Sequence, residues 1–157
     1  MKIPFVDLSA QYAAHRAEFD AALAAVIART AFIGGDFVRA FEREYAAAYG
    51  VKHCISCANG TDAIYVALKM LGIGDDDEVI TTAASWISTS ETITQAGARP
   101  VFVDVDPYCL IDLERLEAAI TPRTRAIIPV HLYGQAAPMS AIRDLCDRHG
   151  LKLIEDC

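Results

Sequence analysis

The sequence has no long uncharged apolar segment, no low-complexity tract and no repeat of fixed period. A membrane-spanning helix needs about 18 or more consecutive apolar residues, so we expect no membrane span. The N-terminus also lacks the apolar core that a signal peptide requires. We therefore expect a cytoplasmic protein, and the absence of low-complexity tracts argues against a disordered chain.

Positive charge is scarce, because 14 lysines and arginines face 21 aspartates and glutamates and leave a net charge of -7. Proteins that bind nucleic acid or anionic lipid present a cationic face, so neither partner is expected here. The remaining composition, 54% hydrophobic and 22% charged, is typical of a globular protein. A length of 157 residues is enough for one domain with a sizeable core.

Cysteine is present in an odd number, five, which is typical of reduced thiols rather than a disulfide framework. Cys54 and Cys57 match the C-x-x-C pattern, which occurs in thiol redox proteins and in zinc sites. The pair lies inside an apolar run, and no second pair of ligands follows it. We keep a redox protein as an alternative and expect no metal site.

The pattern of apolar residues changes after Gly50. Before it, helices are expected over 7–28, with Asp7 and Ser9 as possible caps, and over 37–49, where Gly50 ends the apolar repeat. After it, short apolar runs alternate with helical stretches. Strands are expected at 52–58, 78–83, 100–105, 125–131 and 151–155, and helices near 61–71, 86–96, 112–120 and 139–149.

Strands that are separated by helical crossovers are normally parallel and are covered on both faces. The sequence therefore predicts an α/β fold of three layers, α/β/α, with a mainly parallel sheet behind an N-terminal helical segment over residues 1–50. Pro129 cannot donate to a strand ladder, so an edge or bulged position is expected there.

Ligands of open parallel sheets bind at the carboxyl ends of the strands, so polar residues there are candidate site residues. Gly60 and Thr61 come where a strand is expected to turn into a helix, and backbone N–H groups at such a point could hold a phosphate. An ordinary helix cap is the alternative. The G-x-G-x-x-G and P-loop patterns of nucleotide sites are lacking.

Other candidates follow the later strands. Trp86 could stack on a flat heteroaromatic ring, or could simply pack in the core. Asp156 could accept a hydrogen bond from a protonated ring nitrogen, or could be a cap or a solvated charge. His131 could carry a proton, but a satisfied polar role is commoner. Asp104 and Asp106 are interpreted first as turn formers.

Five segments follow one another in a specific order and spacing. They are Asn59-Gly60-Thr61-Asp62-Ala63, Asp77-Glu78-Val79-Ile80-Thr81, Gly97-Ala98-Arg99-Pro100-Val101-Phe102-Val103-Asp104-Val105, Val130-His131-Leu132-Tyr133-Gly134-Gln135 and Ile154-Glu155-Asp156. Together they resemble the nucleotide-sugar aminotransferases of pyridoxal-phosphate (PLP) fold type I. The resemblance covers essentially the whole chain. One departure is Asp76, which stands where that family usually has glycine.

The resemblance implies that residues 51–157 form part of a PLP-binding large domain. It also implies that Gly60 and Thr61 hold the cofactor phosphate, that Trp86 stacks on the pyridine ring and that Asp156 pairs with the ring nitrogen. Members of this family take an amino group from an amino acid, usually glutamate, and deliver it to a keto-sugar nucleotide. They are typically homodimers with sites shared between subunits.

The Schiff-base lysine of the family is expected beyond the end of this chain, so no catalytic residue is assigned here. The four lysines present, Lys2, Lys52, Lys69 and Lys152, match no such position. We therefore expect an N-terminal fragment that is inactive by itself. Besides the thiol redox protein, two alternatives stay open: a sugar dehydratase on the same fold, in which the lysine is replaced, and a non-catalytic binding or regulatory domain.

Overall fold

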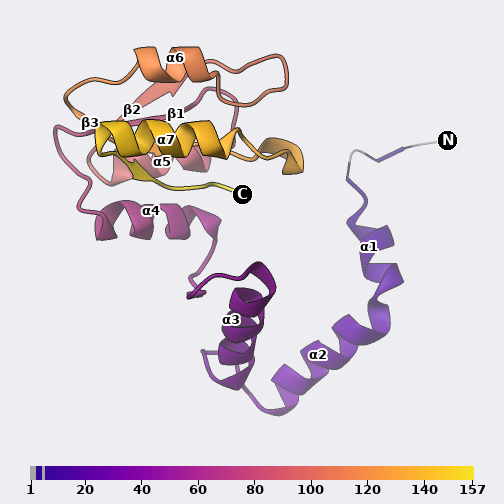
Figure 1. Ribbon diagram of the computed structural model, residues 1–157. Helices are drawn as coiled ribbons and strands as arrows, with labels where there is room; N and C mark the ends of the chain where they lie inside the picture. The colour runs from indigo at the N-terminus through magenta and orange to yellow at the C-terminus, as the bar shows by residue number, and fades with distance from the viewer. Residues whose placement is uncertain (1–2, 5) are drawn as a thin grey trace. The chain divides into compact units, whose positions relative to one another are not determined.

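The computed structural model describes residues 3–4 and 6–157 (Figure 1). The chain divides into two compact units, Met1–Ser56 and Cys57–Cys157. Compact units are not the same as independently folding domains, so the division expected after residue 50 stays a prediction. No helix within the described part of the chain is long and apolar enough to cross a membrane.

The first unit consists of three helices, α1 (Leu8–Ala14), α2 (Arg16–Ala28) and α3 (Asp36–Tyr49). The single helix expected over 7–28 is wrong, because the backbone leaves the helical region at His15, where φ is -124° and ψ is 20°. Asp7 caps α1 as expected by accepting a hydrogen bond from the Ala10 backbone N–H. Gly50 ends α3 with φ of 64°, a left-handed conformation that glycine adopts without steric penalty.

The second unit contains a four-stranded parallel sheet with the order β2-β1-β3-β4. The strands are β1 (Glu78–Thr82), β2 (Arg99–Val103), β3 (Thr124–Ile128) and β4 (Lys152–Leu153). The expected parallel α/β architecture is thereby confirmed. Every residue of β1 is buried, because this strand lies inside the sheet with a partner on each side.

Two expectations about strands need correction. Residues 52–58 form no strand, and Ile55 within this run is 83% exposed. The apolar residues of this run therefore do not indicate a buried strand. Pro129 lies just beyond the end of β3 and interrupts no strand. The irregularity in the pairing of β1 with β3 falls instead at Arg125, because Glu78 pairs with Thr124 and Val79 already pairs with Ala126.

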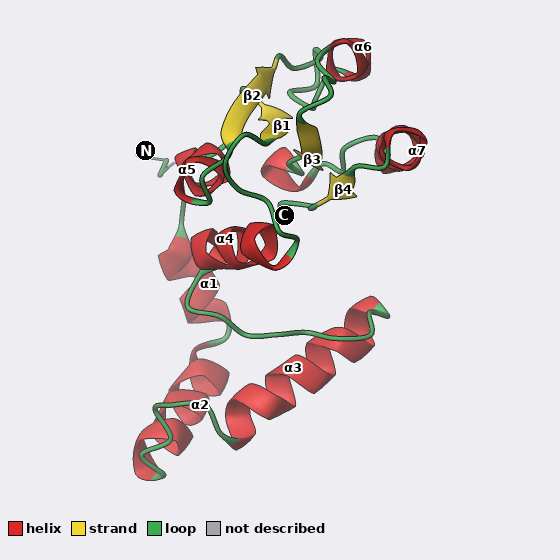
Figure 2. Ribbon diagram, turned by 90° about the vertical axis from the view of Figure 1, so that its left-hand side faces the viewer, coloured by secondary structure: helices red, strands yellow, loops and turns green. Residues whose placement is uncertain are grey.

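Helices cover both faces of the sheet. Figure 2 shows α4 (Gly60–Met70) and α5 (Ile87–Gln95) on one face, and α6 (Leu113–Ala118) and α7 (Met139–His149) on the other. A short 3-10 turn, η1 (Leu132–Gly134), precedes α7. All four helices lie within two residues of the expected ranges, and the three-layer prediction is confirmed.

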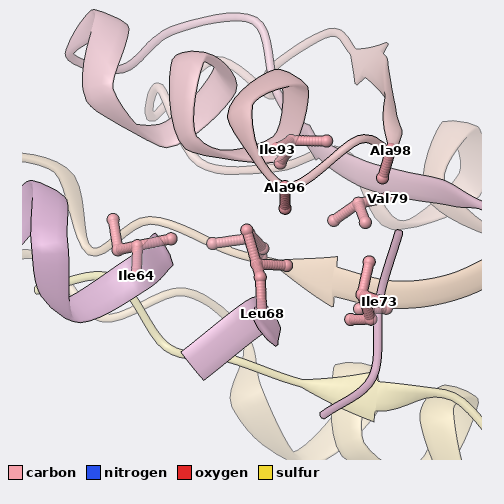
Figure 3. Close-up of a cluster of buried hydrophobic side chains, with 9 residues drawn as sticks. Ile64, Leu68, Ile73, Val79, Ile93, Ala96 and Ala98 are labelled. Carbon is pink, nitrogen blue, oxygen red and sulfur yellow. The ribbon is translucent and has the colours of Figure 1, made fainter. Parts of the chain in front are cut away.

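The sheet separates two apolar clusters, because side chains along a strand alternate between its faces. The cluster under α4 and α5 includes Leu68 of α4, Val79 of β1 and Ile93 of α5 (Figure 3). The opposite cluster includes Ile80, the next residue of β1, together with Ile142 of α7. Burial of each such side chain contributes roughly 1.5–3 kcal/mol, so these clusters hold the helices against the two faces of the sheet.

The turn before β1 explains the departure at Asp76. Asp76 has φ of +68°, in the left-handed region where residues with a Cβ are strained. Glycine is therefore favoured at this position, and aspartate is among the few other residues that tolerate it. Nearby, Gly97 has φ of +97°, and a Cβ there would come within 2.5 Å of the Asp75 Oδ1 atom, so the turn depends on glycine at 97.

Candidate functional site

Three of the candidate residues lie beyond the carboxyl ends of strands, on one edge of the sheet. Trp86 follows β1, His131 follows β3 and Asp156 follows β4. Since the strands are parallel, all their carboxyl ends meet at this edge. We call it the carboxyl edge, and we call the opposite edge, where Glu78 begins β1, the amino edge.

The backbone of Asp156 is held on both sides by the loop that follows β3. Its N–H donates to the Pro129 carbonyl at 3.1 Å, and its carbonyl accepts from the His131 N–H at 2.9 Å. The half-buried side chain accepts one hydrogen bond, at Oδ2, from the Thr89 hydroxyl at 2.7 Å. Oδ1 accepts none from the residues that the structure describes. Asp156 therefore caps no helix and keeps one oxygen available to a ligand.

Trp86 precedes α5 and is 78% exposed. The alternative that this ring packs in the core is therefore wrong. Its side chain borders a pocket of about 260 Å³ whose lining also includes Ser85, Thr89 and Phe102. An exposed indole beside a pocket is available to stack on a planar ligand.

The N-terminus of α4 carries Gly60 and Thr61. Asn59 caps this helix, and its side chain accepts from the Asp62 N–H at 2.9 Å, so the ordinary cap is present. The backbone N–H groups of Gly60 and Thr61 nevertheless donate to nothing among the described residues, and a Cβ built at Gly60 would meet no atom within 4 Å. Two free donors in open space at a helix N-terminus suit an anion.

The Thr61 hydroxyl is already engaged, because it donates to the Ser88 hydroxyl at 2.8 Å. The first turn of α5 therefore reaches both candidate regions: Ser88 contacts Thr61, and its neighbour Thr89 contacts Asp156. This places two N–H groups without an acceptor among the described residues, an exposed indole and a carboxylate with one open oxygen around one helix end. The residues present fit the phosphate, the flat ring and the protonated ring nitrogen of PLP.

His131 serves the fold. Its Nδ1 atom accepts from the Ala137 N–H at 3.1 Å, so the ring proton sits on Nε2, which lies 3.2 Å from Glu155 Oε2. Both ring nitrogens thus have protein partners, as expected of a satisfied polar residue. Asp104 and Asp106 accept backbone N–H groups of their own turns, which confirms their interpretation as turn formers.

The amino edge holds a buried carboxylate that the sequence analysis did not single out. Glu78 is 1% exposed and accepts hydrogen bonds from Arg99, Arg123 and Thr121 at 2.6–3.0 Å. The bond from Thr121 lowers the pKa of Glu78, and Arg123 lowers it further against the opposing effect of burial. A cavity of about 430 Å³ borders this cluster. Because Glu78 is already saturated, the cavity offers a ligand no open carboxylate.

The C-x-x-C pair shows no metal geometry. Cys54 is half-buried, Cys57 is exposed, and both are free thiols that fall on either side of the boundary between the units. Within residues 3–4 and 6–157, no group of three or more histidine, cysteine, aspartate or glutamate side chains is arranged to hold a metal ion.

A family profile described as the DegT/DnrJ/EryC1/StrS aminotransferase family matches residues 13–157. The chain belongs to this family. Its aminotransferases are PLP-dependent, so the membership agrees with a carboxyl edge that fits the cofactor. The expected resemblance to sugar aminotransferases is confirmed.

Two relatives illustrate the similarity. A pleiotropic regulatory protein of Geobacillus stearothermophilus is 50% identical over 99% of this chain and 42% of its own length. A dTDP-3-amino-3,4,6-trideoxy-alpha-D-glucose transaminase of Micromonospora megalomicea is 49% identical over 94% of this chain and 40% of its own length. The chain thus spans about 40% of the length of these curated relatives.

Two solved structures are also similar to this chain. DesV of S. venezuelae, in complex with a ketimine intermediate, superposes with a TM-score of 0.95 at 44% identity, over 99% of this chain and 42% of that chain. A GDP-4-keto-6-deoxymannose-3-dehydratase with a trapped PLP-glutamate geminal diamine gives a TM-score of 0.81 at 29% identity, over 87% and 37%. The same architecture therefore occurs in DesV and in a dehydratase.

Proposed function

We propose that this chain supplies the cofactor-binding edge of a PLP-dependent aminotransferase that moves an amino group from glutamate to a keto-sugar nucleotide. The observation that carries the proposal is the first turn of α5, whose Ser88 and Thr89 hydroxyls reach Thr61 and Asp156 beside the exposed Trp86. Membership of a sugar-aminotransferase family supports it. The nucleotide sugar in the name of the Micromonospora relative supports the substrate class.

Each residue has a defined part in holding the cofactor. The free N–H groups of Gly60 and Thr61 bind the phosphate, and the Trp86 indole stacks on the pyridine ring. Asp156 Oδ1 accepts a hydrogen bond from the ring nitrogen and keeps the ring cationic. A cationic PLP ring withdraws electrons from the carbon at which the amino group is exchanged.

We propose further that these 157 residues do not transaminate alone. The family's lysine both carries the cofactor and moves protons, and neither lysine of the second unit, Lys69 or Lys152, is placed for that task. Lys69 lies nine residues along α4 from Gly60, about 14 Å away, and its ammonium donates to the Ala96 carbonyl. Lys152 begins β4, at the amino edge. Lys2 lies outside the described residues.

We also propose that the protein is cytoplasmic and that it acts as a homodimer.

Two other functions have one observation each in their favour. The similarity to a dehydratase supports an enzyme of that class on the same fold. The name of the Geobacillus relative supports a regulatory role without catalysis. The dehydratase differs from the aminotransferase in what happens after the cofactor binds, and a regulatory domain differs from both in that it catalyses no reaction.

Binding of pyridoxamine phosphate to the purified chain, measured by isothermal titration calorimetry, tests the cofactor site. This form of the cofactor is preferable because its amine cannot condense with surface lysines. We expect saturable binding, and Asp156→Asn should weaken it at least tenfold, because a hydrogen bond to a charged group contributes about 1.5–3 kcal/mol.

The matched control is Asp144→Asn, which removes a carboxylate of α7 that makes no hydrogen bond among the described residues. It should leave the affinity unchanged. Equal weakening by both substitutions would show a general effect of charge and would contradict the assignment of Asp156. Release of 2-oxoglutarate from glutamate by the chain and PLP alone would contradict the proposed inactivity.

A further inference from the structure

We propose that Thr89 is a positioning residue for the cofactor, with Ser85 behind it: two hydroxyls in series orient the Asp156 carboxylate so that Oδ1 faces the ring nitrogen. The inference rests on the proposed function and deepens it, since it names side chains that act on the cofactor only through Asp156.

The geometry of Thr89 is specific. It is the third residue of α5 and is 1% exposed, yet its hydroxyl reaches a carboxylate 67 residues away in the sequence, at 2.7 Å. Its other polar contact is the Ser85 hydroxyl at 2.8 Å. A buried hydroxyl with a single acidic partner costs free energy unless that bond is kept, so it stabilises one orientation of the carboxylate.

The direction of the hydrogen bonds follows from proton count. An ionised carboxylate has no hydrogen, so Thr89 must donate to Asp156 Oδ2. Its single hydrogen is then used, and Ser85 must donate to Thr89. A hydroxyl that accepts one hydrogen bond becomes a stronger donor in the next, so the Ser85 bond strengthens the bond to Asp156.

This arrangement leaves the two oxygens of Asp156 with different tasks. Oδ2 is occupied by Thr89, and rotation of the carboxyl group would break that bond. Oδ1 is thereby kept in one orientation before any ligand arrives. Preorganised acceptors bind more tightly than mobile ones, because no side-chain freedom is lost on binding.

The chain offers a matched control on the same helix. Thr92 is also fully buried, but its hydroxyl donates to the backbone carbonyls of Ser88 and Thr89 and not to a carboxylate. Thr92→Val and Thr89→Val make the same chemical change, three residues apart, in equally buried places. Only the second removes a hydrogen bond to Asp156.

The test compares two ligands by calorimetry on the whole chain: pyridoxamine phosphate, and its analogue in which C–H replaces the ring nitrogen. Thr89→Val should weaken binding of pyridoxamine phosphate about tenfold and leave binding of the analogue within twofold. Thr89→Ser should restore binding of pyridoxamine phosphate, and Thr92→Val should change neither ligand. Ser85→Ala should weaken pyridoxamine phosphate alone, by about threefold.

The outcomes separate this inference from the function on which it rests. Failure of the unaltered chain to bind pyridoxamine phosphate overturns the proposed function and this inference with it. Normal binding by Thr89→Val, or an equal loss for both ligands, overturns the inference alone. If circular dichroism shows that Thr89→Val is unfolded, Ser85→Ala decides, since Ser85 is only partly buried: a loss for pyridoxamine phosphate alone supports the inference, and unchanged binding overturns it.

Discussion

The amino edge of the sheet holds a buried carboxylate, Glu78, and the carboxyl edge holds a half-buried one, Asp156. The two differ in how many hydrogen bonds they accept from the protein. At the amino edge, Arg99 donates one hydrogen bond to Glu78, Arg123 donates two and Thr121 donates one. At the carboxyl edge, the carboxylate of Asp156 accepts a single hydrogen bond, from Thr89. A saturated carboxylate can only stabilise the fold, whereas one with an open oxygen can also receive a ligand. The difference separates the part of the sheet that holds the structure from the part that offers a site.

The largest expected effect is on stability, at the amino edge. Glu78→Ala removes the common acceptor of two guanidinium groups and a hydroxyl, and should lower the free energy of unfolding by about 3 kcal/mol. This is the low end for a broken buried ion pair, because both arginines are largely exposed. Urea unfolding followed by circular dichroism measures it. A loss of unfolding free energy below about 1 kcal/mol would contradict the claim that the carboxylate at the amino edge stabilises the fold.

The same carboxylate should make stability depend on pH. The pKa of Glu78 is lower in the folded chain than the ordinary value of 4.5, so the unfolded chain binds the proton first as pH falls. The contribution of Glu78 to the free energy of unfolding is therefore complete above pH 4.5. It is lost as pH falls through the lower pKa that Glu78 has in the folded chain. Glu78→Gln should flatten the acid side of the stability curve, measured by thermal unfolding between neutral pH and the acid limit. An unchanged slope would contradict the account.

A smaller effect, on binding rather than stability, is expected at the carboxyl edge. Trp86→Ala should weaken pyridoxamine phosphate about tenfold through lost stacking. It should change the unfolding free energy by less than about 0.5 kcal/mol, because the ring is 78% exposed. Trp86→Phe, which keeps an aromatic face, is the control and should bind within a few-fold of the unaltered chain. A large loss of stability would show that Trp86 belongs to the scaffold.

The smallest effect sharpens the account of the amino edge. Asp76 has a left-handed backbone conformation, which costs a residue with a Cβ about 1–2 kcal/mol, and Asp76→Gly removes this strain. Against this gain, glycine loses more backbone entropy on folding, which costs roughly 0.5–1 kcal/mol. The substitution should therefore stabilise the chain by about 0.5 kcal/mol in the same urea measurement. Asp75→Gly, at a neighbouring position without positive φ, should not stabilise it.

Much of the second unit could be predicted from the sequence, because local signals there agree with the fold. The helix expected over 139–149 has these bounds in the structure, and Gly150 ends it in the left-handed conformation. The strand expected at 52–58 failed for a physical reason. A strand exists only when a neighbour pairs with it, and an apolar run does not reveal whether that neighbour is present.

The candidate site could be predicted in part. Gly60, Trp86 and Asp156 could be singled out because each follows or precedes a recognisable element. The bonds that join them could not, because Thr89 and Asp156 are distant in the sequence and meet only through the order of the strands. Glu78 was missed because a charged residue at the start of a strand is usually solvated. The partners that bury it become visible only once Arg99 and Thr124 are paired opposite it.

Trp86 is the only tryptophan of the chain, so its fluorescence reports directly on the carboxyl edge. The most direct test is a titration of the unaltered chain with pyridoxamine phosphate, followed by tryptophan emission. The account predicts saturable quenching with the affinity that calorimetry gives, weakened about tenfold in Asp156→Asn. Unchanged emission from a folded chain, or quenching that is identical in Asp156→Asn, would contradict a cofactor site between Trp86 and Asp156.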